Sequence, residues 1–589
     1  MRSTFFGLEI GRTGMTTAQF GLDVTGHNIA NVDTEGFTRQ RIVSTANDPF
    51  ATIGRFAPVG QGQIGEGVRV KILDQIRSAF LDRRFRTEST THSYWETRTQ
   101  SLSYIESFFD NVNEKTSINH SMAEFFRSMT IVSQDPVSGA PRTLMQTTAM
   151  DLVQQLNSIY QGLIDFQTVE NRAVSTKTND INRIAQDLAD VNKAIYGFEI
   201  TGMIANDLRD KRNILLDELA TYIDVEYEEH PDKFGHSMMT VKIGGQALVS
   251  HDTSYELGIA WRDNPLEGGE KIAIPYWLHM GGYDPSDHAL ENAQLFSENS
   301  RVTGGQLKAH IDMRDGAGNG IDSTQRGIPY YIEMMNNLAR ALVQEINAQH
   351  IQGWSDNPEG SRTGLLFFDD GTQNAAPEAV LDAAGVRIGT KIGSVTYFHE
   401  DNLGGDGHFD PHTATDWGII TGTQYSLTND QLKNITARNL DLSNDIKDSS
   451  FNIAASSTRI SRAGEGESEE LQRGNNVNMN TMHALFRATG IRINIDGQYR
   501  DIGSFDDYGT VIRFDVGNTL HTAKQAAETS RILMLAADNQ RTAVAGVSLD
   551  EEMVGLVRYN HAFNGAARVI TAMDEALDRL INGTGRVGL

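Results

Sequence analysis

Residues 549–583 read LDEEMVGLVRYNHAFNGAARVITAMDEALDRLING. Apolar side chains recur here at alternating steps of three and four, which places them in one stripe along a helix. Acidic residues at 550–552, with Ser548 before them, mark the helix N-terminus, and Gly583 marks its end. A single helix of about thirty residues is marginal in water, so the stripe needs a partner. The stripe consists of Leu556, Tyr559, Phe563, Ala566, Ile570, Met573, Leu577 and Leu580.

A second apolar set lies at the other end of the chain and recurs every seven residues: Leu8, Met15, Leu22 and Ile29. Ala18 and Val32 lie on the intermediate positions, and Gly11 and Thr25 complete the set less well. Small Gly and Thr permit close helix approach but weaken an isolated helix. Two heptad-like stripes at opposite termini therefore predict a terminal coiled coil whose N-terminal part is disordered until it pairs. The alternative is two unrelated surface helices, each packed as ordinary core.

The segment after the first helix, residues 27–41, reads HNIANVDTEGFTRQR. We interpret Asn28 and Asn31 as helix-ending and turn-capping amides, because asparagine favours such positions. A glycine turn follows, and Phe37 begins an extended arm. On that arm, Arg39 and Arg41 either bind carboxylates of a neighbouring subunit or are solvated surface arginines.

These motifs resemble a known family. The run NIAN at 28–31, with a Gly-aromatic pair shortly after it, resembles the N-terminal signature of the axial proteins of the bacterial flagellum: the rod, hook and hook-associated proteins. The sequence TRQ at 38–40 is similar to the hook-associated protein 1 family. At the other end, VSLDEEM at 547–553 and ARVI at 567–570 resemble the C-terminal signature of the same proteins.

Between the ends, the sequence predicts an α+β multidomain chain. Two stripes indicate long helices, one from Leu152 to Phe166 and one from Ile181 to Ile195, and further helices are expected over 206–225, about 328–350 and about 517–545. Alternating apolar residues around Gly244-Gly245 predict a β-hairpin, and a second hairpin is expected at 491–499.

The resulting domain prediction nests each outer segment beside its counterpart from the other end. Residues 1–60 with 541–589 form an α-helical coiled-coil core domain from the N- and C-terminal helices. Residues 61–225, 304–352 and 431–540 form a long-helix bundle, and 226–303 and 353–430 are inserted β-rich outer domains.

The charge of the chain is concentrated in its middle. The formal net charge is −26, yet residues 1–45 hold four basic and four acidic side chains, and 541–589 hold five arginines and six acids. An acidic body discourages nucleic acid and anionic membranes as partners. There is no cysteine, which favours an exported polypeptide, whereas Glu9 and Arg12 interrupt the N-terminal apolar run that a signal peptide would need. Membrane insertion is not expected.

No catalytic, cofactor-binding or metal-binding site is predicted. The best candidate is DGHFDPH at 406–412, but Pro411 prevents a regular helix from presenting His408 and His412 on one face, so we interpret it as a solvated acidic loop. The glycine-rich run at 316–320 lacks the spacing of a dinucleotide fingerprint. A metal-dependent hydrolase built on 353–430 remains the alternative from another class of protein.

The resemblance implies a non-enzymatic structural protein between the hook and the filament. Implied partners are further copies of itself in a ring, the hook protein, hook-associated protein 3, and an export chaperone on the C-terminal helix. It also implies export through the flagellar secretion channel without a cleaved signal peptide, to an extracellular position. The alternative within the family is the hook protein itself, against which the TRQ motif and the long helical body argue. The expected assembly residues are both stripes with Asn28, Asn31, Phe37 and Arg39.

Overall fold

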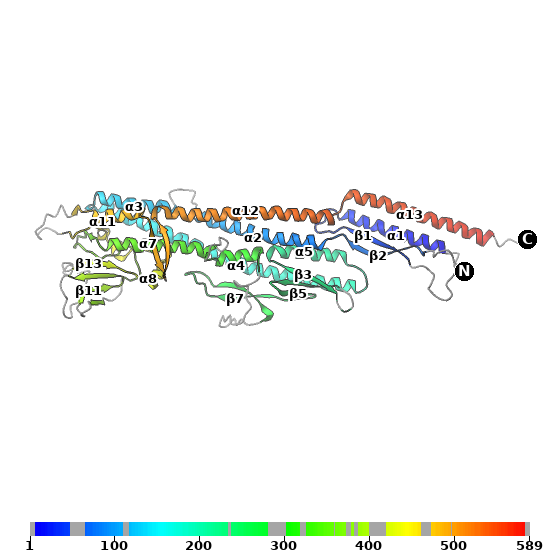
Figure 1. Ribbon diagram of the computed structural model, residues 1–589, viewed down its shortest axis with the longest axis horizontal. Helices are drawn as coiled ribbons and strands as arrows, with labels where there is room; N and C mark the ends of the chain where they lie inside the picture. Colours follow the sequence, from blue (N-terminus) through cyan, green and yellow to red (C-terminus); the bar gives the residue numbers. More distant parts are fainter. Residues whose placement is uncertain are drawn as a thin grey trace, which may run out of the picture.

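The computed structural model describes residues 6–47, 65–109, 117–231, 233, 237–280, 302–318, 326–358, 360–372, 378–381, 387–399, 420–460, 473–495 and 497–583. The molecule is elongated, with both termini at one end and the strands of residues 378–425 at the other (Figure 1). We call the end that carries the termini the terminal module and the remainder the body.

The terminal module pairs the first and last helices of the chain. Helix α1 (Phe6–Ala30) lies beside α13 (Leu549–Asp578), which ends in a short π-helical turn (Arg579–Gly583). Strand β1 (Gln40–Ala46) runs antiparallel to β2 (Val68–Gln75) and packs against α1. The prediction that the two ends pair is therefore confirmed, and they do so within one chain.

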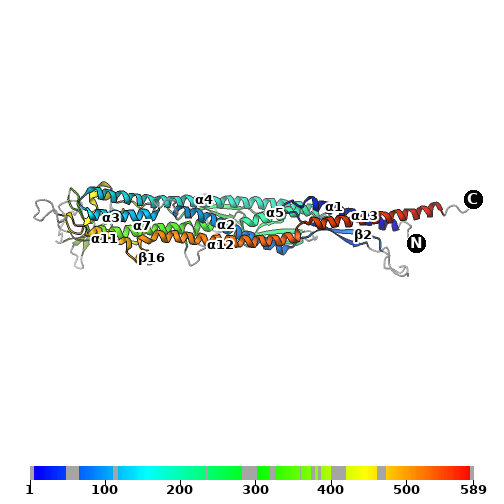
Figure 2. The ribbon, with the colours of Figure 1, turned by 90° about the horizontal axis from the view of Figure 1, so that it is seen from above.

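The body is a bundle of long helices (Figure 2), in which α4 and α12 run along opposite edges. Its main helices are α2 (Ala79–Phe109), α3 (Ile118–Gln134), α4 (Gly139–Glu199), α5 (Asn206–Tyr222), α6 (Gly305–Asp315), α7 (Ile328–His350) and α12 (Phe505–Ala545). The predicted helices at 206–225 and 328–350 are confirmed. Helix α12 begins twelve residues before the expected start, because the Ser504 hydroxyl caps the N–H of Asp507 and Phe505 is buried.

Helix α4 is one continuous helix of 61 residues, where the sequence suggested two stripes. Its first stripe, represented by Leu156 and Leu163, lies in the larger hydrophobic core with α3 and α7. Its second stripe, represented by Ile184 and Leu188, lies in a separate core with α5 and the first sheet. A single rod thus joins two cores.

Small antiparallel sheets flank the bundle. The first sheet has the order β3 (Glu226–Pro231), β4 (Ser237–Ile243), β5 (Gln246–Ser250), β6 (Thr253–Ser254), and β7 (Leu257–Arg262) pairs with β8 (Ile272–Trp277). Both turn glycines between β4 and β5, Gly244 and Gly245, have positive φ, as a two-residue hairpin turn requires, so that hairpin prediction is confirmed.

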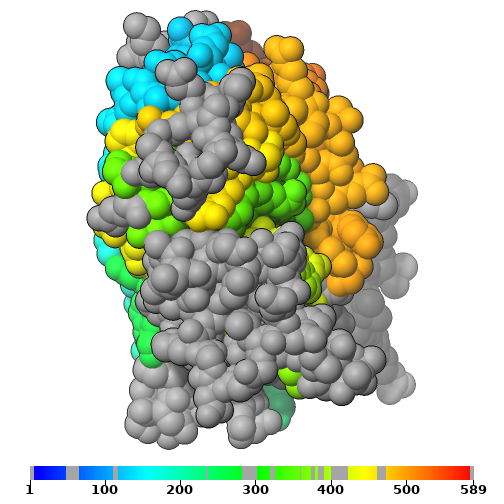
Figure 3. All heavy atoms as spheres, turned by 90° about the vertical axis from the view of Figure 1, so that its left-hand side faces the viewer, coloured from blue at the N-terminus to red at the C-terminus, as the bar shows by residue number. Residues whose placement is uncertain are grey.

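A second set of strands lies toward the far end. It comprises the sheet β10 (Glu378–Leu381), β11 (Arg387–Ile392), β12 (Val395–His399), β13 (Ile420–Tyr425), the pair β9 (Trp354–Ser355) with β14 (Ala454–Ser456), and the confirmed hairpin β15 (Ile491–Ile495) with β16 (Gln498–Gly503). Short helices α8 (Asn429–Asn434), α9 (Asn444–Asp448) and α11 (Val477–Ala484) connect them. Figure 3 looks onto this end, where α3 (cyan) and the yellow-to-orange segment before α12 lie around the bundle.

Two of the sequence features reach outside the described residues. The loop with His408 and His412 lies wholly outside them, and the glycine-rich run at 316–320 is described only to residue 318.

Candidate assembly site

Glycines form the face of α1 that packs on α13. A Cβ atom built on Gly11 would lie 2.7 Å from Cγ1 of Ile570, and one on Gly21 would lie 2.5 Å from the Tyr559 ring. Gly7 stands in the same relation to Met573. Since glycine has no Cβ, the two helix backbones approach closely along the whole pair, and larger residues at these positions would separate them.

This glycine face corrects the sequence interpretation of α1. Leu8, Met15, Leu22 and Ile29 were expected to meet the stripe of α13, but the buried positions are Gly11, Ala18, Gly21, Val24, Thr25 and Asn28 with Thr13. The four residues that were expected to make the contact are half-buried and lie beside the contact face. The intermediate positions of the predicted repeat, Gly11, Ala18 and Thr25, are among the buried residues, so that part of the prediction is confirmed. Gly21 was missed because glycine contributes no apolar side chain.

The stripe of α13 is incompletely covered. Leu556, Tyr559, Phe563, Ile570 and Leu577 are half-buried, while Met573 and Leu580 are 37% and 52% exposed. In this helix, which is described over its whole length, Glu552 is the one buried residue.

Further apolar residues of α13 lie outside the stripe and are exposed. Leu549, Met553 and Val557 follow one another at steps of four and form a row with exposed fractions of 49%, 55% and 51%. We call these three residues the outer row. A helix with two apolar sides, of which one is open, is typical of a segment that packs against additional chains.

A buried polar cluster fixes the base of the helix pair. The Asn28 side chain donates to the Gln40 carbonyl oxygen at 2.9 Å and accepts from the Gln40 N–H at 3.1 Å, as a strand partner would. Its amide also donates to Oε2 of Glu552 at 3.1 Å. Asn28 therefore joins α1, β1 and α13, and the interpretation of this residue as a helix-ending amide is wrong.

Arg39 completes this cluster. Its Nε donates to Oε1 of Glu552 at 2.7 Å, and its Nη1 pairs with Glu551. Against the opposing effect of burial, the bonds to Glu552 and Glu551 raise the pKa of the Arg39 guanidinium. The carboxylates that bind Arg39 thus belong to its own chain, and Arg41 likewise pairs with Asp74 at 3.1 Å. The hypothesis that these arginines bind a neighbouring subunit is not supported by their contacts.

Asn31 and Phe37 shape the turn after α1. Asn31 donates to the His27 carbonyl oxygen at 2.9 Å and accepts from the Thr34 hydroxyl at 3.1 Å, which confirms its capping role. The Phe37 ring meets the His27 ring edge-on, with centroids 5.3 Å apart. Both residues orient the arm rather than project outward.

Further polar contacts, which the sequence did not indicate, tie the terminal module to the body. The backbone N–H of Thr38 donates to Oδ2 of Asp210 on α5 at 3.0 Å, and Arg77 donates to the Thr38 hydroxyl at 3.1 Å. Burial raises the pKa of the Asp210 carboxyl, which the bonds from Thr38 partly offset. The N–H of Arg39 donates to the carbonyl of Ala545, the last residue of α12, at 2.9 Å. The module is therefore held in one orientation.

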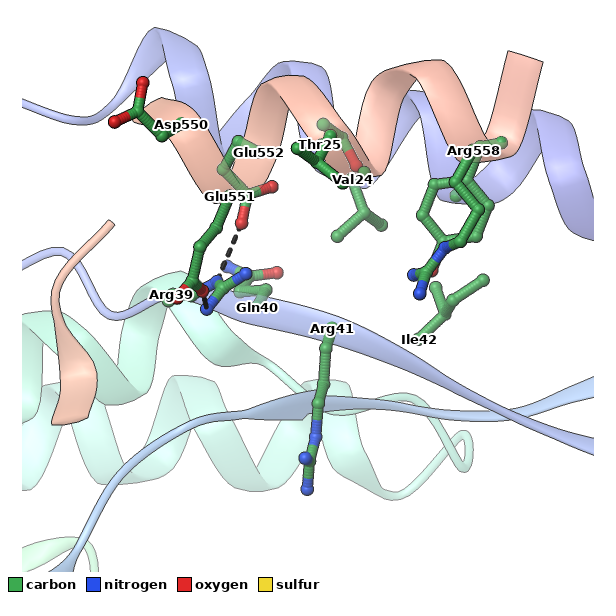
Figure 4. A pocket seen from close by; sticks show the side chains of 14 residues that line it. Val24, Thr25, Arg39, Gln40, Arg41, Ile42, Asp550, Glu551, Glu552 and Arg558 are labelled. Carbon is green, nitrogen blue, oxygen red and sulfur yellow. Dashed lines mark hydrogen bonds and ion pairs between the residues drawn. The ribbon is translucent and has the colours of Figure 1, made fainter. Parts of the chain in front are cut away.

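A groove of about 410 Å³ opens beside this cluster, between β1 and the pair of helices. Figure 4 shows Arg39 reaching Glu551 and Glu552 on one side of the groove and Val24, Ile42 and Arg558 on its other walls. The lining mixes charged and apolar groups and has no arrangement of nucleophile and base.

Within the described ranges, histidine and carboxylate side chains do not gather in groups of three or more that would hold a metal ion. No helix in the described part of the chain combines the length and the hydropathy of a membrane span.

The two ends of the chain and its helical body each match a model of flagellar proteins. Residues 102–368 match the model of the flagellar hook-associated protein FlgK helical domain. Residues 8–38 match the flagella basal body rod protein model, and 540–583 match the C-terminal model of the flagellar basal body rod FlgEFG proteins.

Full-length relatives agree with these matches. Flagellar hook-associated protein 1 of Bacillus subtilis is 25% identical over 598 residues, covering 99% of each chain. The protein of the same name from Salmonella typhimurium is 25% identical and covers 97% of this chain and 98% of its own. The solved flagellar hook junction protein FlgK from Burkholderia pseudomallei shares the fold, with a TM-score of 0.51 at 13% identity, over 79% of this chain and 100% of its own.

These matches define the class: the chain is a structural axial protein of the bacterial flagellum, not an enzyme. Within that class, it is similar over nearly its whole length to flagellar hook-associated protein 1 of Bacillus subtilis and Salmonella typhimurium. Its place is the flagellum, where it assembles with other flagellar components.

Proposed function

We propose that this chain joins the flagellar hook to the filament by self-assembly through its terminal helices. The observation that carries the proposal is the incomplete burial of α13, whose stripe is half-covered by α1 and whose outer row is open. When further copies pack around the helix pair, its exposed apolar area is removed from water. This burial stabilises the assembly by about 25 cal/mol per Å² of apolar surface.

The partners follow from family membership and remain part of the proposal. Copies of this chain form a ring, with the hook protein on one side and hook-associated protein 3 on the other. The polypeptide leaves the cell through the flagellar secretion channel without a cleaved signal peptide, and a chaperone holds its C-terminal helix before export. The exposed apolar rows of α13 supply a surface that such a chaperone would cover.

We further propose the four-part domain division, with one change. Strand β2 pairs with β1, so the terminal module takes in residues up to about 75 rather than 60. The long-helix bundle and the two strand-rich insertions keep the residue ranges predicted from the sequence. The strands of the first insertion lie along one flank of the bundle, and those of the second lie at the end away from the termini (Figure 1).

The test compares substitutions on the two sides of α13 with a polar control. Purified protein is added to cells that lack the native junction protein, which separates assembly from export. Phe563→Asp places a carboxylate in the half-buried stripe, and the pair Met553→Asp with Val557→Asp places charge on the outer row. We expect both variants to fail to support filament growth, while Asp574→Asn, on an exposed position, supports it.

The outer-row variant separates folding from assembly. Since its positions are about half exposed, it should keep the helix content of the unsubstituted protein by circular dichroism. Filament growth equal to that of the unsubstituted protein in both carboxylate variants would refute assembly through the terminal helices.

A further inference from the structure

An apolar tip protrudes where α4 turns into α5. Phe198, Ile200 and Met203 lie within six residues and are 55%, 55% and 57% exposed. This tip is distinct from the terminal helices. Large apolar side chains grouped on a protruding turn are typical of a protein contact surface.

The turn that carries these side chains is internally braced. Glu199 accepts two bonds from Arg209, at 2.6 and 2.8 Å, and Thr201 donates to the Phe198 carbonyl oxygen at 2.7 Å. Gly202 supplies the positive φ of 86° that the reversal requires. Because the tip is fixed before any contact forms, binding through it loses little conformational entropy.

A second apolar patch lies on α2 and α12. Phe80 is 72% exposed and Val544 is 42% exposed. One helical turn deeper on each helix, Arg84 donates to Oε1 of Gln540 at 3.0 Å, so Phe80 and Val544 are neighbours at the end of this helix pair. Figure 2 shows α4 and α12 on opposite edges of the body, so the tip at the end of α4 and the patch at the end of α12 belong to opposite edges.

Both features lie at the same level along the molecule. The tip leads directly into Asn206, which bonds to the Leu73 carbonyl oxygen of β2 at 3.3 Å. The patch ends at Ala545, whose carbonyl oxygen binds Arg39 beside β1. Each therefore borders the junction of body and terminal module, from opposite sides.

The surrounding charges are complementary. Beside the tip, the Glu199 carboxylate is neutralised by Arg209. The side chain of the next carboxylate, Asp207, is 71% exposed; it accepts from the Gln40 side-chain amide at 2.9 Å and lies 3.5 Å from His27. Beside the patch, the Arg84 guanidinium is held by a neutral amide. Two copies that each carry a net charge of −26 repel one another. They can therefore meet most easily where both surfaces are apolar and where a carboxylate beside one surface lies opposite a guanidinium beside the other.

We propose that the tip of one copy docks on the Phe80–Val544 patch of the next copy of this chain. A contact between two different patches on opposite flanks is heterologous, and such contacts repeated at one level close into a ring. The inference rests on the proposed self-assembly and deepens it, because it adds a lateral contact in the body to the one made by the terminal helices.

The absence of cysteine from the chain permits a direct test. A protein with Ile200→Cys and Val544→Cys is assembled onto hooks under reducing conditions and then oxidised. We expect a ladder of covalent multimers of this chain, at least tenfold above either single-cysteine variant. The control pairs Ile200→Cys with Phe514→Cys, an exposed position about 45 Å further along α12, and should give no ladder.

Each other outcome decides against the inference. Junctions that support filaments but give no ladder would overturn the lateral contact and leave the proposed function standing. A ladder of equal strength from the Phe514 control, or cross-links to a protein of another sequence identified by mass spectrometry, would also overturn it. Failure of the unsubstituted chain to support filaments would refute the proposed function and, with it, this inference.

Discussion

Helices α4 and α13 have the same kind of apolar stripe and different surroundings. In α4, Leu156 and Leu163 are fully buried, whereas in α13 the equivalent positions, such as Phe563 and Leu577, are half-covered. The body is therefore complete within one chain, and the terminal module is packed on one side only. Periodicity reports which face of a helix is apolar, but the number of neighbours that cover that face depends on the assembly.

The largest expected effect is in the body. Leu163→Ala should lower the free energy of unfolding of the larger core by about 2–5 kcal/mol, because the side chain is fully buried. Leu577→Ala in α13 should cost well under about 2 kcal/mol, since its surroundings are half open. Urea unfolding followed by tryptophan fluorescence measures the body, because all five tryptophans lie outside the terminal helices, and helical circular dichroism in the same titration includes α13. Equal losses in the two helices would refute the comparison.

The body should also be sensitive to acid through His350. Its Nδ1–H donates to the Leu365 carbonyl oxygen at 2.7 Å, and its Nε2 accepts from the Ala454 N–H at 2.9 Å, so the buried ring is neutral. Burial lowers the pKa of His350 from 6.5 to about 4. Its contribution to stability is complete above pH 6.5 and is lost as the pH falls to about 4, a decrease of about 3 kcal/mol.

A non-titrating variant checks this assignment. His350→Asn should be less stable at neutral pH and should show a shallower loss of the urea midpoint between pH 6.5 and 4. An unchanged slope in that variant would show that other groups cause the acid sensitivity.

At the junction, Glu552→Gln should lower the free energy of unfolding of the terminal module by about 1.5–3 kcal/mol, because the buried carboxylate accepts hydrogen bonds from both Asn28 and Arg39. The matched control is Glu551→Gln, whose side chain is 63% exposed and which should cost less than about 1 kcal/mol. Faster proteolysis between α12 and α13 in the first variant alone is the expected readout. Equal cleavage rates in both would show that the buried carboxylate does not hold the module in place.

The smallest effects distinguish the glycines of α1. Gly11→Ala places a methyl group against Ile570 and should destabilise the helix pair by about 1–3 kcal/mol. Gly26→Ala meets nothing within 4 Å and should stabilise the helix by up to about 1 kcal/mol. Thermal unfolding of the helical circular dichroism signal measures both. Equal shifts would mean that close approach at Gly11 is unimportant.

Sequence periodicity was sufficient where side chains define the contact. The stripe of α4, the bounds of α7 and the Gly244-Gly245 hairpin were predicted because burial, propensity and turn geometry agree there. In α1 it was partly sufficient: Gly11, Ala18 and Thr25 were placed on the repeat and are buried, whereas Gly21, which leaves no hydropathy signal, was missed. A row of glycines at helical spacing, opposite a long stripe, was the available indication.

The junction could not be predicted for a different reason. Asn28, Gln40 and Glu552 are far apart in the sequence, and a polar side chain gives no periodic signal of burial. For Arg39 the sequence left two alternatives, carboxylates of a neighbouring subunit or a solvated arginine, because its actual partner in the same chain depends on the three-dimensional path of β1 past α13.

The central claim is that the terminal module is half-packed in one chain and completed by neighbouring copies. Hydrogen exchange of the backbone amides in α4 and α13, in the monomer and in assembled junctions, tests it most directly. We expect α4 to be equally protected in both states and α13 to gain at least tenfold protection on assembly. Protection of α13 in the monomer equal to that of α4, with no gain on assembly, would contradict the claim.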